Sequence, residues 1–322
     1  MKQFIRNIYH ETILGYYLIH PIYIIYELVL KIVPDETFVR FNFKRHMGYS
    51  LDLKNPKTLN EKINWLKLHD RTPLHTICSD KFKVRDYIRE KIGDKFLVPL
   101  CYETKKPSDI VPENLPNHPC IIKTNHNSSG GIIVKNKEEI EWRKIQFHLK
   151  KLLRENYYYR TREWQYKNIE PRIIVEKLLQ NNAGKIPFDY KLHCFNGKVV
   201  TIQVDIDRGS DNHSRNWYNT DWKREPFKWS SVKEGGKKTD PSQSDVEKPV
   251  TLDEMIKLSQ ILAEPFPYVR VDWYDVDGIL YFGELTFHHD GGNRPIEPKE
   301  WDLKLGKKLN LKSTGKQKTF ST

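Results

Sequence analysis

One segment of the chain has the residue types that can hold a phosphate group. Lys123 ends an apolar run that begins at Cys120, and the sequence Thr-Asn-His-Asn-Ser-Ser-Gly-Gly follows it. A fixed cation would stand beside a flexible run of backbone N–H donors, a combination that binds phosphate. The spacing matches neither a P-loop nor GxGxxG, and a plain hairpin loop explains the glycines equally well. Lys81 follows Asp80 at an expected helix start and is a second candidate, because a cation there opposes the helix dipole unless it has a partner.

Two carboxylates lie where a charged side chain needs a partner. Asp272 and Glu284 each stand inside a strongly apolar run that predicts a β-strand, and an unpaired carboxylate buried there would be costly. An arginine such as Arg270 or Arg294 would make a structural ion pair. A hard divalent metal bound through oxygen would make a functional site, and the residues alone leave both interpretations open.

These residues need secondary structure that brings them together, and local patterns predict it. A capping box from Thr58 to Glu61 predicts the start of one helix. Asn196-Gly197 and the segment 275–278 predict the turns of two β-hairpins. We expect helices over 58–69, from Ser79 or Asp80 to Gly93, over about 137–155 and over about 251–263, single strands at 120–123, 131–134 and 172–176, and hairpin strands at 189–195 with 198–206 and at 268–274 with 279–287.

The charge is distributed unevenly along the 322 residues. The formal net charge is +12, with +13 on residues 41–204, −6 on 205–290 and +6 on 304–322. A basic first half and an acidic second half favour phosphate on one side of a site and a divalent metal on the other. No nucleic acid is expected as a partner, because no RNP, zinc-finger or helix-turn-helix pattern accompanies the charge. Four cysteines without a CxxC pair argue against a disulfide scaffold and a zinc ribbon, and favour a reducing cytosol.

The N-terminal segment 13–33 is apolar and aromatic and has about the length of a membrane span. His20, Pro21 and Glu27 interrupt it, and a secretory signal peptide is not expected because a basic region and a cleavage site are missing. Two interpretations remain: a monotopic anchor with tyrosines at the headgroup level, or a helix pair packed on the protein's own core. In both, the body of the protein faces the cytosol.

Five segments, in this order, resemble the ATP-grasp superfamily. They are DKFKVRDYI around Lys81, IIKTNHNSSGG around Lys123, Glu176–Leu179 after RIIV, DYKLHCFNGKV from Asp189, and VRVDWYDVDGILYFGELTF from Val269. More closely, the chain is similar to the TupA-like branch, which is associated with teichuronopeptide and capsular polysaccharide synthesis and whose members are often labelled glycosyltransferases. The resemblance covers about residues 45–305.

The resemblance implies an α+β class and an ATP-grasp fold, in which two α/β subdomains clasp a nucleotide. The expected division has an apolar helical segment at 1–40, a possible membrane anchor, followed by a part with the phosphate-binding lysines at 41–177. A C-terminal subdomain with metal ligands follows at 178–305, and a basic, disordered tail at 306–322.

The resemblance also implies roles for individual residues. Lys81 and Lys123 match the lysines that hold the nucleotide phosphates, and Ser128, Ser129, Gly130 and Gly131 match the glycine-rich flap over them. Glu176, Lys177 and Leu179 belong to the hinge whose edge reads adenine and whose carboxylate takes a ribose hydroxyl. Asp272 and Glu284 match magnesium ligands, and Thr286 stands where most relatives have an asparagine as third ligand. The segment 288–292 differs from the usual arginine-bearing loop, so the candidates for stabilising the transition state are Lys191, Arg208, Arg270 and Arg294.

The function that follows is an ATP- and Mg²⁺-dependent carboxylate–amine ligase. An acyl phosphate would form on a carboxylate, such as that of a uronic acid, and an amino acid or amino sugar would attack it. The acceptor would belong to a capsular or O-antigen type polysaccharide, and the enzyme would work in the cytosol at the inner face of the membrane.

The alternative is a metal-dependent glycosyltransferase that uses Asp205 and Asp207 as an Asp-x-Asp motif. A local salt bridge to Arg208 is the simpler interpretation of that motif.

Overall fold

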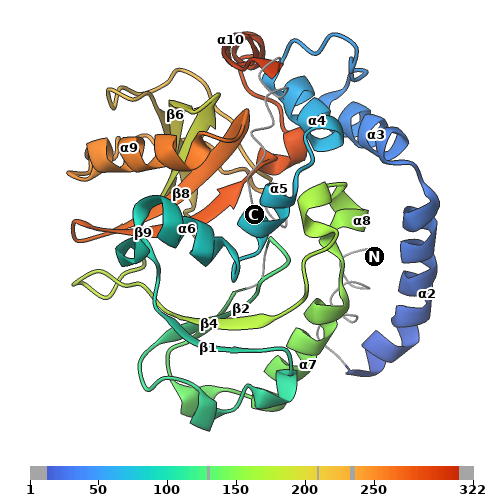
Figure 1. The fold of residues 1–322 in the computed structure, drawn as a ribbon, viewed down its shortest axis with the longest axis vertical. Helices are drawn as coiled ribbons and strands as arrows, with labels where there is room; N and C mark the ends of the chain where they lie inside the picture. The colour runs from blue at the N-terminus through green and yellow to red at the C-terminus, as the bar shows by residue number, and fades with distance from the viewer. Residues whose placement is uncertain (1–12, 129–130, 209, 233–235, 312–322) are drawn as a thin grey trace.

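The computed structural model describes residues 13–128, 131–208, 210–232 and 236–311, which form two antiparallel sheets with helices around them (Figure 1). The strands are β1 (Leu100–Thr104), β2 (Cys120–Thr124), β3 (Ile132–Val134), β4 (Ile173–Lys177), β5 (Asp189–Phe195), β6 (Lys198–Ile206), β7 (Ser214–Tyr218), β8 (Tyr268–Val276) and β9 (Ile279–Thr286). The helices are α2 (Ile13–Ile32), α3 (Asp35–Met47), α4 (Leu59–His69), α5 (Pro73–Ser79), α6 (Val84–Ile92), α7 (Trp142–Arg154), α8 (Tyr157–Thr161), α9 (Leu252–Ala263) and α10 (Glu300–Lys308).

The large sheet has the order β7-β6-β5-β8-β9 and contains both predicted hairpins. Asn196 and Gly197 adopt positive φ angles of 49° and 79°, the conformation that a two-residue hairpin turn requires. One face of the sheet is apolar, and its core contains Leu192 from β5 together with Ile88 from α6 and Leu262 from α9. The opposite face holds polar side chains, because residues alternate sides along each strand.

The small sheet has the order β1-β4-β2-β3 and lies in the lower part of Figure 1, next to α7. Its core contains Ile122 and Val175 from the strands and Leu149 from α7. Lys123 and Thr124 end β2, so the segment that follows leaves the sheet at the side where the large sheet lies. The predicted strand–loop–strand arrangement around this segment is confirmed.

The structure corrects the helix that was expected to start at Ser79 or Asp80. Helix α5 ends at Ser79 and α6 begins at Val84, so Lys81 lies in the turn between them. Asp80 Oδ1 accepts hydrogen bonds from the backbone N–H groups of Phe82 and Lys83, at 2.9 and 3.3 Å. Aspartate in this position stabilises a turn rather than a continuous helix.

Residues 59–92 pack with the large sheet, although they precede the small sheet in the chain. Thr58 forms the predicted capping box with Glu61 at the start of α4. Helix α4 joins α10 and the segment His289–Gly292 in a second core with Trp217 and Trp229. Helix α6 lies on the apolar face of the large sheet. The part predicted as 41–177 is thus shared between the two sheets.

The sequence patterns missed the helices α3, α5, α8 and α10 and the strands β1 and β7. Helix α10 ends at Lys308, so the first residues of the tail predicted at 306–322 belong to this helix. The rest of that prediction, residues 312–322, lies outside the described part of the chain. Helix α3 shares a small core with Leu51 through Val39 and Phe43. Helix α2 instead stands on the right-hand side of Figure 1, beside α8. In the described ranges, we find no helix with both the length and the apolar character that crossing a membrane requires.

Candidate active site

The small sheet presents Lys123 next to a carboxylate. Lys123 Nζ lies 3.0 Å from Glu176 Oε2, because β2 and β4 are neighbours in the sheet. Arg85, from α6, approaches the other oxygen of Glu176, with Nη1 at 3.3 Å. One carboxylate therefore stands between two cations that come from different parts of the chain.

Lys81 connects this group to the loop after β2 and to the large sheet. Its backbone N–H donates to Asn125 O at 3.1 Å, and its Nζ donates to Asn127 O at 2.5 Å. Burial lowers the pKa of Lys81, while Glu284 raises it and Lys123 lowers it further. The ammonium group is thus close enough to Lys123 and to Glu284 to interact with both charges, and it marks the place where the two sheets meet.

The predicted flap is described only at its ends. Ser128 Oγ donates to the hydroxyl of Tyr157 at 2.8 Å, which ties the first flap residue to α8. Ser129 and Gly130 lie outside the described residues. At Gly131, a Cβ would stand 2.6 Å from Ile121 Cδ1, so a larger residue would displace that side chain. Glycine lets the chain return directly onto β3.

The predicted hinge follows β4. Lys177 ends the strand with an exposed side chain, and its backbone N–H donates to Pro99 O at 3.0 Å. The next N–H, from Leu178, donates to Pro119 O at 3.0 Å, and the Leu179 side chain is half-buried. The hinge is therefore fixed to both segments that lead into β1 and β2.

Asp272 and Glu284 meet at one arginine on the large sheet. Arg270 donates to the two oxygens of Asp272 at 2.7 and 2.6 Å, and to Glu284 Oε1 at 3.0 Å. Burial raises the pKa of Asp272 to about 6 despite this pairing. Burial also raises the pKa of Glu284, but Lys81 and Arg270 outweigh it, so the net shift is downward. The ion pair expected as one interpretation is present.

The same carboxylates could hold a divalent cation. Thr286 Oγ1 lies 3.3 Å from Glu284 Oε1, so the third predicted ligand stands beside the second. Within the described ranges, no three His, Cys, Asp or Glu side chains are placed to hold a metal by themselves. Mg²⁺ commonly binds through one or two carboxylates plus phosphate oxygens, and Asp272 and Glu284 supply that number. The donor set fits Mg²⁺ accompanied by a phosphate better than Mg²⁺ alone.

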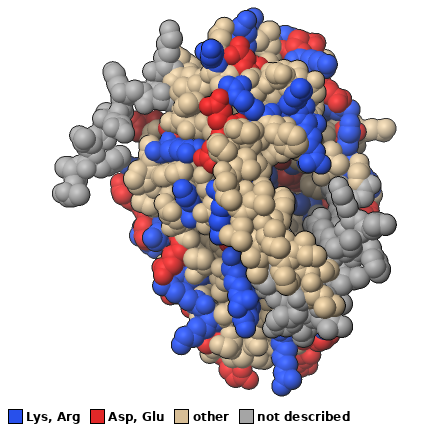
Figure 2. All heavy atoms as spheres, turned by 90° about the vertical axis from the view of Figure 1, so that its right-hand side faces the viewer, with Lys and Arg blue, Asp and Glu red and all other residues tan. Residues whose placement is uncertain are grey.

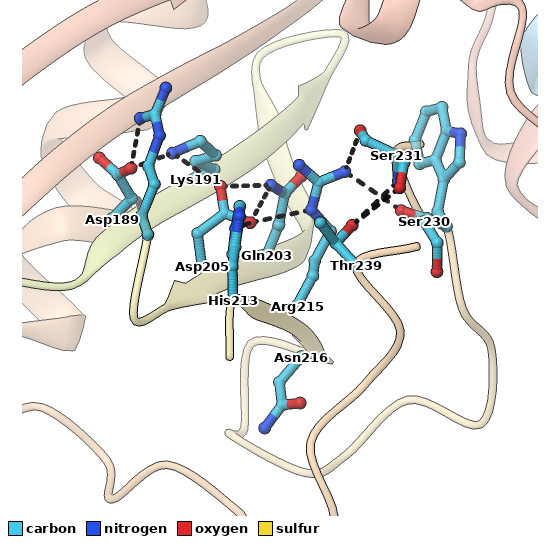
Figure 3. A network of polar contacts seen from close by, with 12 residues as sticks. Asp189, Lys191, Gln203, Asp205, His213, Arg215, Asn216, Ser230, Ser231 and Thr239 are labelled. Atoms are coloured by element: carbon cyan, nitrogen blue, oxygen red, sulfur yellow. Dashed lines mark hydrogen bonds and ion pairs between the residues drawn. The ribbon is translucent and has the colours of Figure 1, made fainter. Parts of the chain in front are cut away.

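Lys191 lies at the centre of a buried group of carboxylates (Figure 3). Its Nζ is 3.0 Å from Asp189 Oδ2, 3.3 Å from Asp205 Oδ2 and 3.7 Å from Asp272 Oδ2. Only 4% of its side chain is exposed. Burial raises the pKa of Asp189, but Lys191 and Arg208 outweigh it and lower the pKa to about 2. Asp189 therefore stays charged in the interior.

The remaining predicted cations differ in position. Arg208 Nη1 donates to Asp189 Oδ2 at 2.5 Å, and 58% of the Arg208 side chain is exposed. Arg294 accepts hydrogen bonds at its backbone oxygen from Asn60 and Trp229. In the described part of the chain, no ion pair brings the guanidinium of Arg294 to the other predicted residues. Three of the four candidate cations thus converge, and Arg294 does not.

A closed ring of side chains extends this group across the sheet. Arg270 donates to His289 Nδ1 at 2.8 Å, so that nitrogen is the acceptor, and burial lowers the pKa of His289 well below its usual value. His289 Nε2 lies 3.6 Å from Asp290, which is 3.6 Å from Arg215. Arg215 donates to Asp205 at 2.9 Å. The ring runs Asp272, Arg270, His289, Asp290, Arg215, Asp205, Lys191 and back to Asp272.

Sequence patterns missed Arg85, Asp189, Arg215 and the role of His289. One signal was present: charged residues two apart in an apolar strand, such as Asp189 and Lys191, indicate a shared polar face. Arg85 gave no comparable signal, since its partner lies 91 positions away. Only the packing of α6 brings the two together.

The Asp-x-Asp alternative finds no support in the geometry. Asp205 is buried and engaged by Lys191, Arg215 and His213, the last at 3.3 Å. Asp207 is exposed in a turn with a φ of 51°. The prediction of a local salt bridge between Arg208 and this motif is also wrong, because Arg208 pairs with Asp189 rather than with Asp205 or Asp207.

Comparison with known proteins gives a family and a set of similar folds. A family model described as TupA-like ATPgrasp matches residues 61–310, and a search of curated proteins gives no match. D-alanine–D-alanine ligase from Bacillus anthracis is 19% identical with a TM-score of 0.39, over 66% of this chain and 57% of that one. The ATP-grasp ligase PsnB with its minimal precursor is 11% identical with a TM-score of 0.39, over 80% and 68%. The ADP complex of PurK is 13% identical with a TM-score of 0.38, over 74% and 52%. The chain spans little more than half the length of the first and third of these proteins.

Proposed function

The chain belongs to the TupA-like ATP-grasp family, and we propose that it is an ATP- and Mg²⁺-dependent ligase that joins a carboxylate to an amine. The convergence of two oppositely charged groups supports this proposal most directly. On the small-sheet side, the single carboxylate of Glu176 faces three cations, which are Lys81, Lys123 and Arg85. On the large-sheet side, the two carboxylates of Asp272 and Glu284 meet at the single cation of Arg270.

On the small-sheet side, the lysines would hold the phosphates of ATP. Lys81 and Lys123 are positioned from a turn and a strand end, and the segment from Ser128 to Gly131 would close over the phosphates. The backbone of the hinge from Lys177 to Leu179 would face adenine. The carboxylate of Glu176 would orient Lys123 and Arg85 and retains lone pairs for a ribose hydroxyl.

On the large-sheet side, Asp272 and Glu284 would hold Mg²⁺, with Thr286 beside them. When bound, the metal would neutralise charge on the phosphate oxygens. Arg270 now occupies both carboxylates, so it would have to turn toward the phosphate or the acceptor when the site fills. Its other partner, His289, is neutral and holds the guanidinium near the sheet during that change.

The reaction would proceed in two transfers. A carboxylate oxygen of the acceptor attacks the γ-phosphorus, and the bond from that phosphorus to the β-phosphate oxygen breaks. ADP leaves, and the acceptor now carries an acyl phosphate. The amine then attacks the acyl carbon, inorganic phosphate leaves, and the amine loses a proton. Of the candidate cations, Arg208 is the most accessible to an acceptor carboxylate, while Lys191 and Arg270 would stabilise charge from within. Arg294 makes no ion pair with the other candidates in the described part of the chain and is the weakest candidate.

For the acceptor, we propose a cell-surface polysaccharide of capsular or O-antigen type. Its uronic acid would supply the carboxylate, and an amino acid or amino sugar the amine, or the reverse. This substrate class comes from the family resemblance. Ligation would take place in the cytosol at the inner face of the membrane, where such polymers are assembled.

The test is a thermal-shift panel on the purified chain with Mg-ATP, Mg-ADP and UDP-sugars. We expect Mg-ATP to raise the melting temperature, since a ligand that binds only the folded state stabilises it. Lys123→Ala and Asp272→Ala should remove most of that increase. Lys135→Ala changes an exposed lysine after β3 and should leave it intact. A shift with UDP-sugars and none with ATP or ADP would reject the proposal.

A further inference from the structure

Helix α2 carries a broad apolar face that the described parts of the protein do not cover. Its exposed apolar residues are Leu18, Ile22, Ile24, Ile25, Tyr26, Leu28, Val29 and Ile32, with exposed fractions that reach 82% at Ile32. At about 100° per residue, these side chains occupy an arc of about 200° around the helix. The seam between two partner helices is narrower than this. The width of the face fits a continuous apolar medium better than a second copy of the helix.

The opposite side of α2 is attached to the body of the protein. Leu30 is buried, and the guanidinium of Arg162 donates to the backbone oxygens of Leu30 and Val33, the latter at 3.0 Å. These contacts satisfy carbonyl groups at the end of the helix, which have no partner within it. The Tyr158 hydroxyl donates to Asp35 just beyond, at 2.7 Å. The attachment fixes which side of α2 faces outward.

Positive charge lies next to this face. Helix α7 has five basic residues and no acidic one, and its Arg143 and Lys150 are exposed. The end of α7 is close to α2, since Glu155 just after α7 interacts electrostatically with Glu27 of α2. Lys31, near the end of α2, adds a cation whose Nζ lies 5.2 Å from the ring centre of Tyr159 in α8. Figure 2 looks onto the side of the molecule that bears α2 and shows lysine and arginine side chains bordering a wide uncharged surface.

We propose that α2 and α7 together dock the protein on an anionic bilayer surface. Helix α2 would lie in the plane of the interface with its apolar arc among the acyl chains, and the α7 cations would contact the lipid headgroups. Helix α8, which holds α2, also contacts the flap through Tyr157 and Ser128. Docking would therefore place the flap side of the site next to the membrane. This inference concerns a surface outside the nucleotide site and does not depend on the ligase reaction.

The test is flotation of the full chain with phosphatidylcholine vesicles, with and without phosphatidylglycerol. We expect the wild type to float with the anionic vesicles. The double variant Ile25→Glu with Val29→Glu should lower the bound fraction at least about tenfold, since each change removes an apolar side chain from the acyl boundary. The matched control, Val250→Glu with Ile279→Glu, changes two exposed apolar residues elsewhere and should float like the wild type.

A second variant tests the electrostatic part. Arg143→Glu with Lys150→Glu should weaken binding to the anionic vesicles about tenfold and leave binding to neutral vesicles unchanged. All variants should keep the melting temperature that the wild type has without ligand, which shows that they are folded and keeps this test independent of ATP binding. The proposal fails if the wild type does not float with anionic vesicles. It also fails if sedimentation shows a wild-type dimer that the α2 variant dissociates, because a second copy would then cover the face.

Discussion

The two sheets hold their charged side chains in different ways. On the large sheet, Lys191 and its three carboxylates are buried, and two of these carboxylates, Asp205 and Asp272, belong to the closed ring. On the small sheet, Lys123 is 27% exposed and shares one carboxylate with a second cation. The first arrangement satisfies nearly every charge before any ligand arrives. The second leaves cations in excess, so an anionic ligand can supply what is missing.

The difference follows from the energetics of burial. A charge removed from water must be paired with good geometry, and a network of fixed partners provides this on the large sheet. Charges near solvent gain little from a partner and can exchange it at small cost. We infer that the large sheet supplies a preorganised framework, and that the small sheet supplies the groups that change partners when a nucleotide binds.

Removal of Lys191 should cause the largest loss of stability and so tests the difference between the two sheets most directly. Lys191→Met leaves Asp189, Asp205 and Asp272 with one arginine each and takes away their common cation. We expect the free energy of unfolding to fall by about 3 kcal/mol. Urea denaturation monitored by tryptophan fluorescence measures this value.

The matched change on the small sheet is Lys123→Met, which replaces a lysine that is 27% exposed. Its cost should stay below about 1 kcal/mol. Equal losses of stability for the two variants would show that the two sheets do not differ in the way proposed.

The pH dependence of stability sharpens the comparison within the large sheet. The pKa of Asp272 is about 6 in the folded protein, above its usual 3.8, so the proton binds more tightly to the folded state. The stability linked to this proton is fully present below pH 3.8 and is lost as the pH rises through 6. For wild type relative to Asp272→Asn, we expect a loss on the order of 2 kcal/mol between pH 4 and 7.

Asp189 should act in the opposite direction and in a different range. Its pKa of about 2 is below the usual value, so its contribution to stability is present above pH 3.8 and is lost as the pH falls toward 2.

Denaturation curves of wild type and Asp272→Asn at pH 4, 5, 6 and 7 isolate the effect of Asp272. Parallel pH profiles for the two proteins would contradict the assignment.

Local patterns in the sequence predicted many of the helices and strands, but few of the ion pairs between charged side chains. The Asn196-Gly197 turn and the Thr58 capping box depend on residues a few positions apart, and both form as expected. Helix α6 was extended too far because Asp80, which starts a turn, was taken for a helix start. Proximity in sequence also suggested an Asp205–Arg208 bridge, whereas Asp205 pairs with Arg215 across the β6–β7 ladder.

The predicted site residues came from a resemblance in sequence order, and geometry adds what order cannot contain. That Asp272 and Glu284 share Arg270 depends on the register of β8 and β9. That Lys191 reaches Asp205 and Asp272 depends on β5 lying between β6 and β8. Strand order is set by the packing of the whole sheet, so no short pattern reveals these contacts.

Removal of the Glu176 charge tests the exchange of partners on the small sheet. Glu176→Gln removes the anion between Lys123 and Arg85, and the two cations then lack a counter-charge. Without ligand, we expect a loss of about 1 kcal/mol, because both cations stay partly solvated. Phosphate groups would restore the missing charge, so Mg-ATP should raise the melting temperature of Glu176→Gln more than that of the wild type. If Glu176 instead binds the nucleotide directly through a ribose hydroxyl, the variant loses that contact and its thermal shift is smaller. The sign of this difference therefore decides whether Glu176 orients the phosphate-binding cations or contacts the nucleotide itself.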